Sequence, residues 1–389
     1  MTFRIGIDAR KAADFGVGTY IRELVGALAR APGAGDFEFV LFVRPGETAF
    51  DGLPANFSTA PEPAGGYSIS ELTTFPLRLR RAALDLFHAT HYVLPPAAAP
   101  RAVVTIHDTL HLRFPEDLPS HAARVYAGFF LRRSLKRARR VIAVSQAARS
   151  DLVRLDSCAA GKIRVIEHGV SAGFRANLPP EEAARVREKL GLPQRYALAV
   201  GGDRPHKNIA RLLTAWARLA REGFDLPLVV AGPRRRPGDP LTAEAQCLGL
   251  RDLVRFPGEV AREDMPGLYA GARLLVFPSL GEGYGLPVVE AMACGVPVVT
   301  SSVSALPEAA GGAARLVDPL DEGEIARAVE EVAKDGRLRE ELIGRGLARA
   351  AVLSWASAAQ ATLEVYREAL ALPPTFPLPA GEGGASSAG

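Results

Sequence analysis

The sequence predicts an α/β protein with two doubly wound parallel-sheet domains that face a central cleft. A chain of 389 residues is long for a single domain. Short β-branched or apolar runs alternate with longer amphipathic stretches along it, which is typical of βαβ units and parallel sheets. Each half offers about six such runs, enough for a doubly wound sheet of its own.

The candidate strands alternate with helical patterns, of which GTYIRELVGALARA (18–31) is the clearest. In the first half they are residues 3–8, 37–43, 84–89, 102–108, 139–145 and 162–169. In the second half they are residues 196–202, 226–232, 253–259, 273–279, 296–301 and 313–318. Ligands of such sheets bind beyond the carboxyl ends of the strands, so functional residues are expected in loops that follow strands.

The join between the domains is predicted in LPPEEAARVREKLGLPQR (178–195), where a Pro-Pro start precedes a charged helix and Gly-Leu-Pro. This divides the chain into an N-terminal domain, 1–180, and a C-terminal domain, 181–353. The segment 354–372 is predicted to form one helix. The Pro-, Gly- and Ser-rich tail 373–389 is expected to be disordered.

Composition is typical of a soluble globular protein, with 48% hydrophobic and 23% charged residues. The cysteines are far apart and form no CxxC pair, which argues against a zinc site or a disulfide framework; they are Cys158, Cys247 and Cys294. A reducing cytoplasm is therefore the simplest compartment. The N-terminus lacks a signal-peptide pattern, and no apolar run approaches the length of a transmembrane helix.

A modest basic excess, with net charge +4, is concentrated in RRSLKRARR (132–140), where six of nine residues are Arg or Lys. A solvated helix face is the ordinary interpretation. The functional interpretation is attraction to anionic lipid or to a phosphate-bearing acceptor. Nucleic acid is not an expected partner, because no basic motif interleaved with aromatic residues supports it.

The strongest functional segment is PSLGEGYGLPVVEAMACGVPVV (278–299), in which a strand, a Gly-rich loop and a helix follow one another. The glycines let the backbone pass close to a ligand, and the helix start near Leu286 offers free N–H groups to a diphosphate. Glu282 in the loop can accept hydrogen bonds from a sugar, and Glu290 in the helix can accept from a ribose diol. The alternative is turn glycines beside two surface glutamates.

A second loop follows a strand in AVGGDRPHKNIARLLTAWARL (199–219) and carries Arg204, His206 and Lys207. The next helix begins near Asn208, a plausible N-cap. Basic side chains at this loop would neutralise the phosphates of a departing nucleoside diphosphate. An exposed basic turn is the alternative.

Two weaker features lie in the first half. Gly16 and Gly18 precede a helix without completing a GxGxxG motif, so they are weak evidence alone. In the segment 103–115, a central strand ends at His107 and Asp108. His107 can hydrogen-bond a sugar hydroxyl or the reacting oxygen. The alternative is a buried structural histidine. The neighbouring histidines lack convincing metal-ligand spacing: His88, His91 and His111.

The combination of motifs resembles the retaining glycosyltransferases of family 4, also called group 1, which have the GT-B architecture of two Rossmann-like domains. Their signature, Glu, seven residues and Glu, matches Glu282 to Glu290. The resemblance covers nearly the whole chain, through GVGTY (16–20), TIHD (105–108), RRVIAVSQAARSDL (139–152), IRVIEHGV (163–170) and PHKN (205–208).

The resemblance implies a nucleotide-diphosphate-sugar donor on the C-terminal domain and a glycan or lipid-linked acceptor on the N-terminal domain. It implies catalytic roles for His107, Lys207 and Glu282. The helix 354–372 resembles the family's return helix, which packs on the N-terminal domain. The donor-binding residues implied are Gly16, Gly18, Arg204, His206, Val260, Gly283, Tyr284, Gly285, Leu286 and Glu290.

Many relatives carry Arg-Lys-Asn where this chain has His206-Lys207-Asn208, so either Arg204 or His206 would complement Lys207 at the diphosphate. No DxD-like pair stands in a persuasive loop, and we expect neither a metal nor another cofactor. Charge stabilisation by Lys207 and helix amides would suffice. Retention would arise by same-face attack, or by a double displacement in which Glu282 is the candidate nucleophile.

GDP-mannose is the first guess for the donor, from the likeness to bacterial mannosyltransferases of polysaccharide assembly, and a UDP-sugar is the alternative. Other functions in the same architecture are a sugar-nucleotide epimerase, a phosphorylase, and a nucleotide-sugar-binding protein without enzymatic activity. The expected location is the cytoplasm, with peripheral contact to the anionic inner face of the plasma membrane through 132–140.

Overall fold

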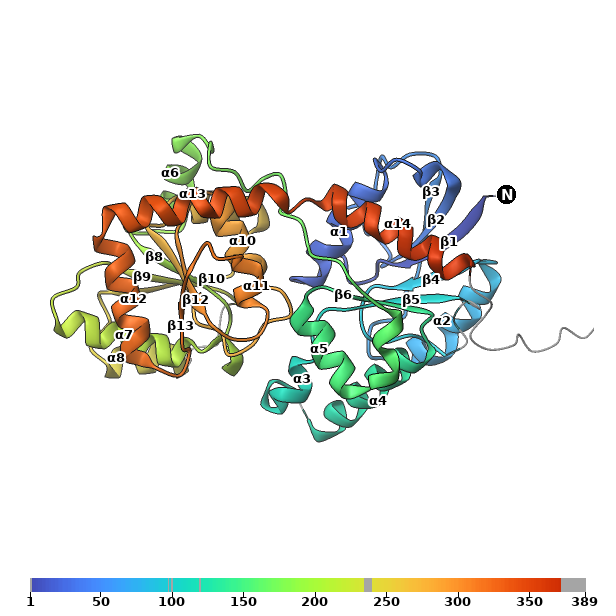
Figure 1. The fold of residues 1–389 in the computed structure, drawn as a ribbon, viewed down its shortest axis with the longest axis horizontal. Coiled ribbons are helices and arrows are strands. Elements are labelled where there is room, and N and C mark those ends of the chain that lie inside the picture. Colours follow the sequence, from blue (N-terminus) through green and yellow to red (C-terminus); the bar gives the residue numbers. More distant parts are fainter. Residues whose placement is uncertain (1, 97, 99–100, 119, 234–239, 372–389) are drawn as a thin grey trace, which may run out of the picture.

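The computed structural model describes residues 2–96, 98, 101–118, 120–233 and 240–371, so the tail expected at 373–389 lies outside the described residues. Two parallel sheets lie side by side, each with helices around it (Figure 1). The chain passes from the first sheet to the second after β7 and returns between α13 and α14. The fold is therefore two α/β domains, as the sequence predicted.

The first sheet has the strand order β3-β2-β1-β4-β5-β6-β7, and its order reverses between β1 and β4. Such a reversal opens a crevice at the carboxyl ends of the strands. The strands are β1 (Phe3–Asp8), β2 (Phe37–Val43), β3 (Phe57–Pro61), β4 (Leu86–Ala89), β5 (Ala102–Ile106), β6 (Arg140–Ala143) and β7 (Ile163–Val165). The helices before the first crossing are α1 (Val17–Leu28), α2 (Ile69–Arg81), α3 (Leu110–Arg113), α4 (His121–Arg137) and α5 (Gln146–Leu155).

The second sheet has the order β10-β9-β8-β11-β12-β13, with the reversal between β8 and β11. The strands are β8 (Ala197–Val200), β9 (Leu228–Ala231), β10 (Val254–Gly258), β11 (Leu274–Phe277), β12 (Val298–Ser301) and β13 (Arg315–Val317). The helices are α6 (Pro180–Lys189), α7 (Ile209–Arg221), α8 (Pro240–Cys247), α9 (Met265–Ala270), α10 (Leu286–Ala293), α11 (Leu306–Ala310), α12 (Glu322–Lys334) and α13 (Gly336–Val352).

The central strands are apolar throughout because helices cover both faces of a parallel sheet. All residues of β5 and of β11 are buried. Every predicted strand is present, although several are shorter than predicted. The strand β3 was not predicted, because it is an edge strand whose run FSTAP is partly exposed and ends in proline.

The last helix, α14 (Trp355–Ala371), returns to the first domain and packs against α1 (Figure 1). Its Tyr366 hydroxyl lies 2.7 Å from Nδ1 of His88, and Glu368 pairs with Arg140 at 2.7 Å. Among the described residues, no helix has the length and apolarity needed to span a bilayer.

The basic run 132–140 does not form a single solvated helix face, which corrects the ordinary interpretation of its sequence. Because α4 ends at Arg137 and the chain then enters the sheet, Arg139 is buried and Arg140 belongs to β6. Arg132 and Lys136 remain exposed on α4.

The two segments that cross between the domains, the first after β7 and the second between α13 and α14, touch one another. The N–H of Val170, in the first crossing, donates to the carbonyl of Leu353 in the second at 3.1 Å. Gly169 lies so close to the backbone of Trp355 that a Cβ would stand 2.2 Å from its nitrogen. The helix α6 packs against α9 and thus belongs to the second domain.

Candidate functional site

The Gly-rich loop between β11 and α10 lies against the first domain. Gly285, the N-cap of α10, has φ +111°, a conformation that favours glycine. A Cβ on Gly283 would stand 2.1 Å from the carbonyl oxygen of His107, so only glycine permits this approach. The loop therefore joins the helix start predicted to bind a diphosphate to the end of β5.

Lys207 and Glu282 form an ion pair at the edge of this loop, with Nζ 2.7 Å from Oε1. Their side chains are only 19% and 12% exposed, so water screens the pair little. Lys207 ends the short 3-10 turn after β8, at Pro205–Lys207. Two residues predicted to act on the phosphate and on the sugar are thus neighbours, beside the first turn of α10.

Glu290 lies one turn into α10, where the hydroxyl of Tyr269 donates to its Oε2 at 3.0 Å. Burial raises the pKa of Glu290 to about 7, although some of its surface stays accessible. A carboxylate with one neutral donor keeps acceptor capacity for a further pair of hydroxyl groups. The arrangement suits the predicted contact with a ribose diol.

His107 follows β5 at the carboxyl edge of the first sheet. Its Nε2 lies 3.0 Å from the carbonyl oxygen of Thr90, which fits an Nε2–H donor and leaves Nδ1 as an acceptor. The ring of Tyr20 meets the imidazole edge-on at 4.8 Å between centroids. Burial lowers the pKa of His107, so the ring is neutral and can act as a hydrogen-bonding group.

The prediction that Asn208 is the N-cap of α7 is confirmed for its position, but not for the hydrogen bond expected of a capping side chain. Asn208 stands at the N-cap position of α7 with φ +60°, but its side chain makes no cap hydrogen bond. Instead Nδ2 donates to the carbonyls of Pro278 and Pro319 at 2.9 and 2.7 Å. It thereby ties the Lys207 loop to the end of β11. In that loop Arg204 is exposed, and His206 is buried with its ring 5.8 Å from that of Phe114.

Other predicted donor-binding residues have clear structural surroundings. The Tyr284 side chain is buried and its hydroxyl donates to the carbonyl of His168 at 3.3 Å, so it points toward the first crossing. Gly18 lies inside the first turn of α1, where a Cβ would stand 2.4 Å from a neighbouring carbonyl oxygen. Internal packing thus accounts for this glycine.

The remaining three occupy loops and a helix start. Gly16, with φ +63° and open space around its Cβ position, is the N-cap of α1. Val260 is buried just after β10, and Leu286 is the first residue of α10. The second domain therefore supplies most of the predicted donor site, at the carboxyl ends of β8, β10 and β11.

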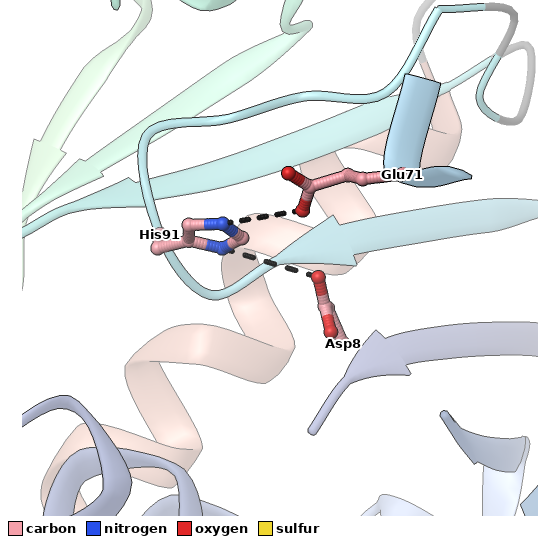
Figure 2. A group of neighbouring side chains, drawn as sticks. All are labelled: Asp8, Glu71 and His91. Atoms are coloured by element: carbon pink, nitrogen blue, oxygen red, sulfur yellow. Dashed lines mark ion pairs between the residues drawn. The ribbon is translucent and has the colours of Figure 1, made fainter. Parts of the chain in front are cut away.

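Figure 2 shows a buried group that the sequence analysis missed, made of Asp8, Glu71 and His91. The histidine nitrogens lie 3.9 Å from Asp8 Oδ2 and 3.6 Å from Glu71 Oε1. Such side chains can bind a metal ion. However, Arg10 donates to the same two oxygens at 2.6 and 2.7 Å, so its guanidinium already supplies the positive charge between them. The group is therefore an ion network at the carboxyl ends of β1 and β4, in the middle of the first sheet.

A cavity of about 760 Å³ lies between α3, α5 and the loop after β12. Thr109, Asp151 and Arg154 line it from the first domain, and Ser304 lines it from the second. The Ser304 hydroxyl donates to the carbonyl of Glu282 at 2.8 Å. The cavity thus adjoins the Gly-rich loop between β11 and α10 (the donor loop) and contacts both domains.

Two family models match the chain. The model described as "Glycosyl transferases group 1" covers residues 181–349, and "Glycosyltransferase Family 4" covers residues 16–174. Over 284 residues the chain is 36% identical to O-antigen chain mannosyltransferase B of Escherichia coli, spanning 72% of this chain and 74% of that protein. It is 31% identical to the serotype-specific mannosyltransferase WbdA of Escherichia coli over 60% of this chain, but the match spans only 29% of that protein's length.

Solved structures share the fold at lower identity. Sucrose-phosphate synthase from Thermosynechococcus elongatus superposes with a TM-score of 0.74 at 23% identity, covering 95% of this chain and 99% of that one. HepE of Anabaena, solved in complex with UDP and glucose, gives a TM-score of 0.69 at 20% identity, covering 94% and 100%.

Proposed function

Because this chain belongs to the group 1, or family 4, glycosyltransferases of GT-B fold, we propose that it transfers a hexosyl group from a nucleoside-diphosphate sugar to a glycan or lipid-linked acceptor. The observation that carries the proposal is the Lys207–Glu282 ion pair beside the start of α10, with Glu290 one turn further along the same helix.

Each group has a distinct part in donor binding. The start of α10 and Lys207 offer N–H groups and positive charge to the diphosphate. As the glycosidic bond breaks, negative charge grows on the leaving phosphate, and Lys207, whose side chain is largely buried, stabilises that charge. Glu282 accepts hydrogen bonds from the sugar hydroxyls, and Glu290 accepts from the ribose.

We propose GDP-mannose as the donor, with a UDP-sugar as the alternative. The first choice follows from the relative named as an O-antigen chain mannosyltransferase. The alternative follows from the structural neighbour solved with UDP and glucose. A measurement of how strongly GDP and UDP compete for the enzyme distinguishes the two proposed donors.

We further propose that transfer proceeds without a metal ion and with retention at the anomeric carbon. The leaving group is a diphosphate, which needs charge stabilisation rather than a proton from an acid. Same-face attack, with the leaving phosphate taking the acceptor proton, is favoured because the Glu282 carboxylate is paired with Lys207, which makes it a weaker nucleophile. Proton NMR of the product's anomeric signal tests the stereochemistry.

The acceptor side of the proposal includes contact with the anionic inner face of the plasma membrane. On α4, Val125 and Phe129 are 59% and 60% exposed, and Arg132 and Lys136 continue the same helix face at i+7 and i+11. An apolar patch followed by exposed cations suits an interface with anionic lipid. The protein should sediment together with anionic vesicles, and the double substitution Arg132→Gln and Lys136→Gln should abolish this binding. Equal binding to neutral vesicles would contradict this contact.

The function is tested by following nucleoside diphosphate release from GDP-mannose and from UDP-glucose, with and without a mannan oligosaccharide acceptor. Acceptor-dependent release together with a lengthened glycan is the expected result. Donor interconversion without acceptor would identify an epimerase, and phosphate-dependent release of a sugar phosphate would identify a phosphorylase. Tight nucleotide binding with no turnover would identify a binding protein.

A further inference from the structure

The helix α5 begins after the carboxyl end of β6, where the first domain contacts the second. Its N-cap is Ser145, whose Oγ accepts a hydrogen bond from the N–H of Ala148 at 2.9 Å. The first amides of a helix have no partner within the helix. Here Gln146 and Ala147 find their acceptor in the other domain.

That acceptor is the carboxylate of Glu308, on α11 of the second domain. The N–H of Gln146 lies 2.8 Å from each carboxylate oxygen, and the N–H of Ala147 lies 3.3 Å from Oε2. A negative charge at a helix N-terminus is favoured by the helix dipole as well as by the hydrogen bonds. Glu308 thus caps a helix across the domain boundary.

The same helix end is also bound by the donor loop. The Ser145 hydroxyl donates to the carbonyl of Gly283 at 2.7 Å. Gly283 in turn lies against the backbone of His107, close enough that no side chain fits between them. The start of α5 is therefore fixed to two parts of the second domain, and these contacts set how the donor loop meets the end of β5.

The backbone of Glu308 is held by Arg349 of the second domain, and Arg349 is in turn paired with a residue of the first crossing. Arg349 on α13 donates to the backbone carbonyls of Glu308 and Ala309 at 3.1 Å each. The same guanidinium pairs with Glu167, in the first crossing, at 2.6 Å. Because α11 is anchored beside the crossings, a change in domain orientation would separate the Glu308 carboxylate from α5.

We propose that Glu308 is a positioning residue, a latch that holds the two domains in the orientation in which His107 faces the donor loop. This inference rests on the proposed glycosyl transfer. Glu308 does not touch the donor groups; it acts through α5 and Ser145. Loss of the latch should leave the nucleotide site on the second domain intact and lower the fraction of molecules in the productive orientation.

The test compares Glu308→Ala and Glu308→Gln with Glu340→Ala, which removes an exposed carboxylate of the same domain on α13. Turnover, GDP and UDP affinity by calorimetry, melting temperature and small-angle scattering are measured for each full-length variant. We expect Glu308→Ala to lower kcat by at least about tenfold, to change nucleotide Kd by less than about twofold, and to increase the radius of gyration. Glu308→Gln should fall between, because its amide oxygen still accepts one hydrogen bond.

Wild-type kcat and unchanged scattering in Glu308→Ala would overturn the latch. So would a loss of kcat that follows a lower melting temperature and weaker nucleotide binding, since that pattern indicates a merely structural role. If the wild-type protein transfers no sugar from either donor, the proposed function fails. The scattering of Glu308→Ala compared with Glu340→Ala still decides whether Glu308 holds the domains together.

Discussion

Glu290→Gln should stabilise the protein above about pH 7 while weakening nucleotide binding, because above that pH the Glu290 carboxylate is ionised despite its burial. Burial raises its pKa from 4.5 to about 7, so the folded protein holds this proton more tightly than the unfolded chain does. Between these two pH values the unfolded chain releases the proton first, and the carboxyl group makes the free energy of unfolding decrease as pH rises.

The magnitude follows from the two pKa values. Above pH 7 the full difference applies, and the ionised carboxylate lowers the free energy of unfolding by about 3 kcal/mol. Glutamine has the same shape, has no charge, and keeps an oxygen for the Tyr269 hydroxyl. We therefore expect Glu290→Gln to stabilise the second domain by about 3 kcal/mol at pH 8 and by less than about 1 kcal/mol at pH 5.

Urea denaturation at the two pH values, followed by circular dichroism, measures this difference in matched buffers. The same variant should bind nucleoside diphosphate about tenfold more weakly at pH 8, because a neutral amide accepts weaker hydrogen bonds from a ribose than a carboxylate does. An equal gain in stability at pH 5 and pH 8, or no gain at pH 8, would refute the reasoning.

Three further outcomes are expected. Lys207→Ala should lower kcat by about 10²- to 10³-fold, because it removes the positive charge that stabilises the leaving group and leaves Glu282 unpaired. Arg204→Ala in the same loop should lower kcat less. Equal losses in the two variants would contradict the role assigned to Lys207. EDTA should leave transfer unchanged, and a loss restored by Mg²⁺ would disprove metal independence. Tyr366→Phe should lower the free energy of unfolding by about 1–3 kcal/mol in urea titrations, because buried His88 loses a partner; an unchanged midpoint would contradict this.

Local features were the ones that the sequence could predict. Strands buried on both faces appear as continuous apolar runs, so the central strands of both sheets were located from composition and spacing. The helix start after Gly285 was also predicted, because Gly285 and the following proline determine the conformation of their own backbone. The edge strand β3 was missed because its partly exposed residues give no such pattern.

Contacts between distant parts of the chain were not predictable in this way. The side chain of Asn208 binds carbonyls 70 and 111 residues away instead of capping its own helix. Arg10 and Glu71 meet only because the start of α2 lies beside the carboxyl end of β1, a central strand of the first sheet. The cap that Glu308 provides for α5 depends on the orientation of two domains, which no local spacing encodes.

The central claim is that the start of α10, with Lys207 and Glu290, binds a nucleoside diphosphate. Isothermal titration of GDP and UDP into the wild-type protein, Lys207→Ala and Glu290→Gln tests it most directly. We predict saturable binding of one nucleotide to the wild-type protein. In each variant this binding should be at least about tenfold weaker, a loss of about 1.4 kcal/mol or more of binding free energy. Binding of the same strength in all three proteins, or binding of neither nucleotide, would contradict it.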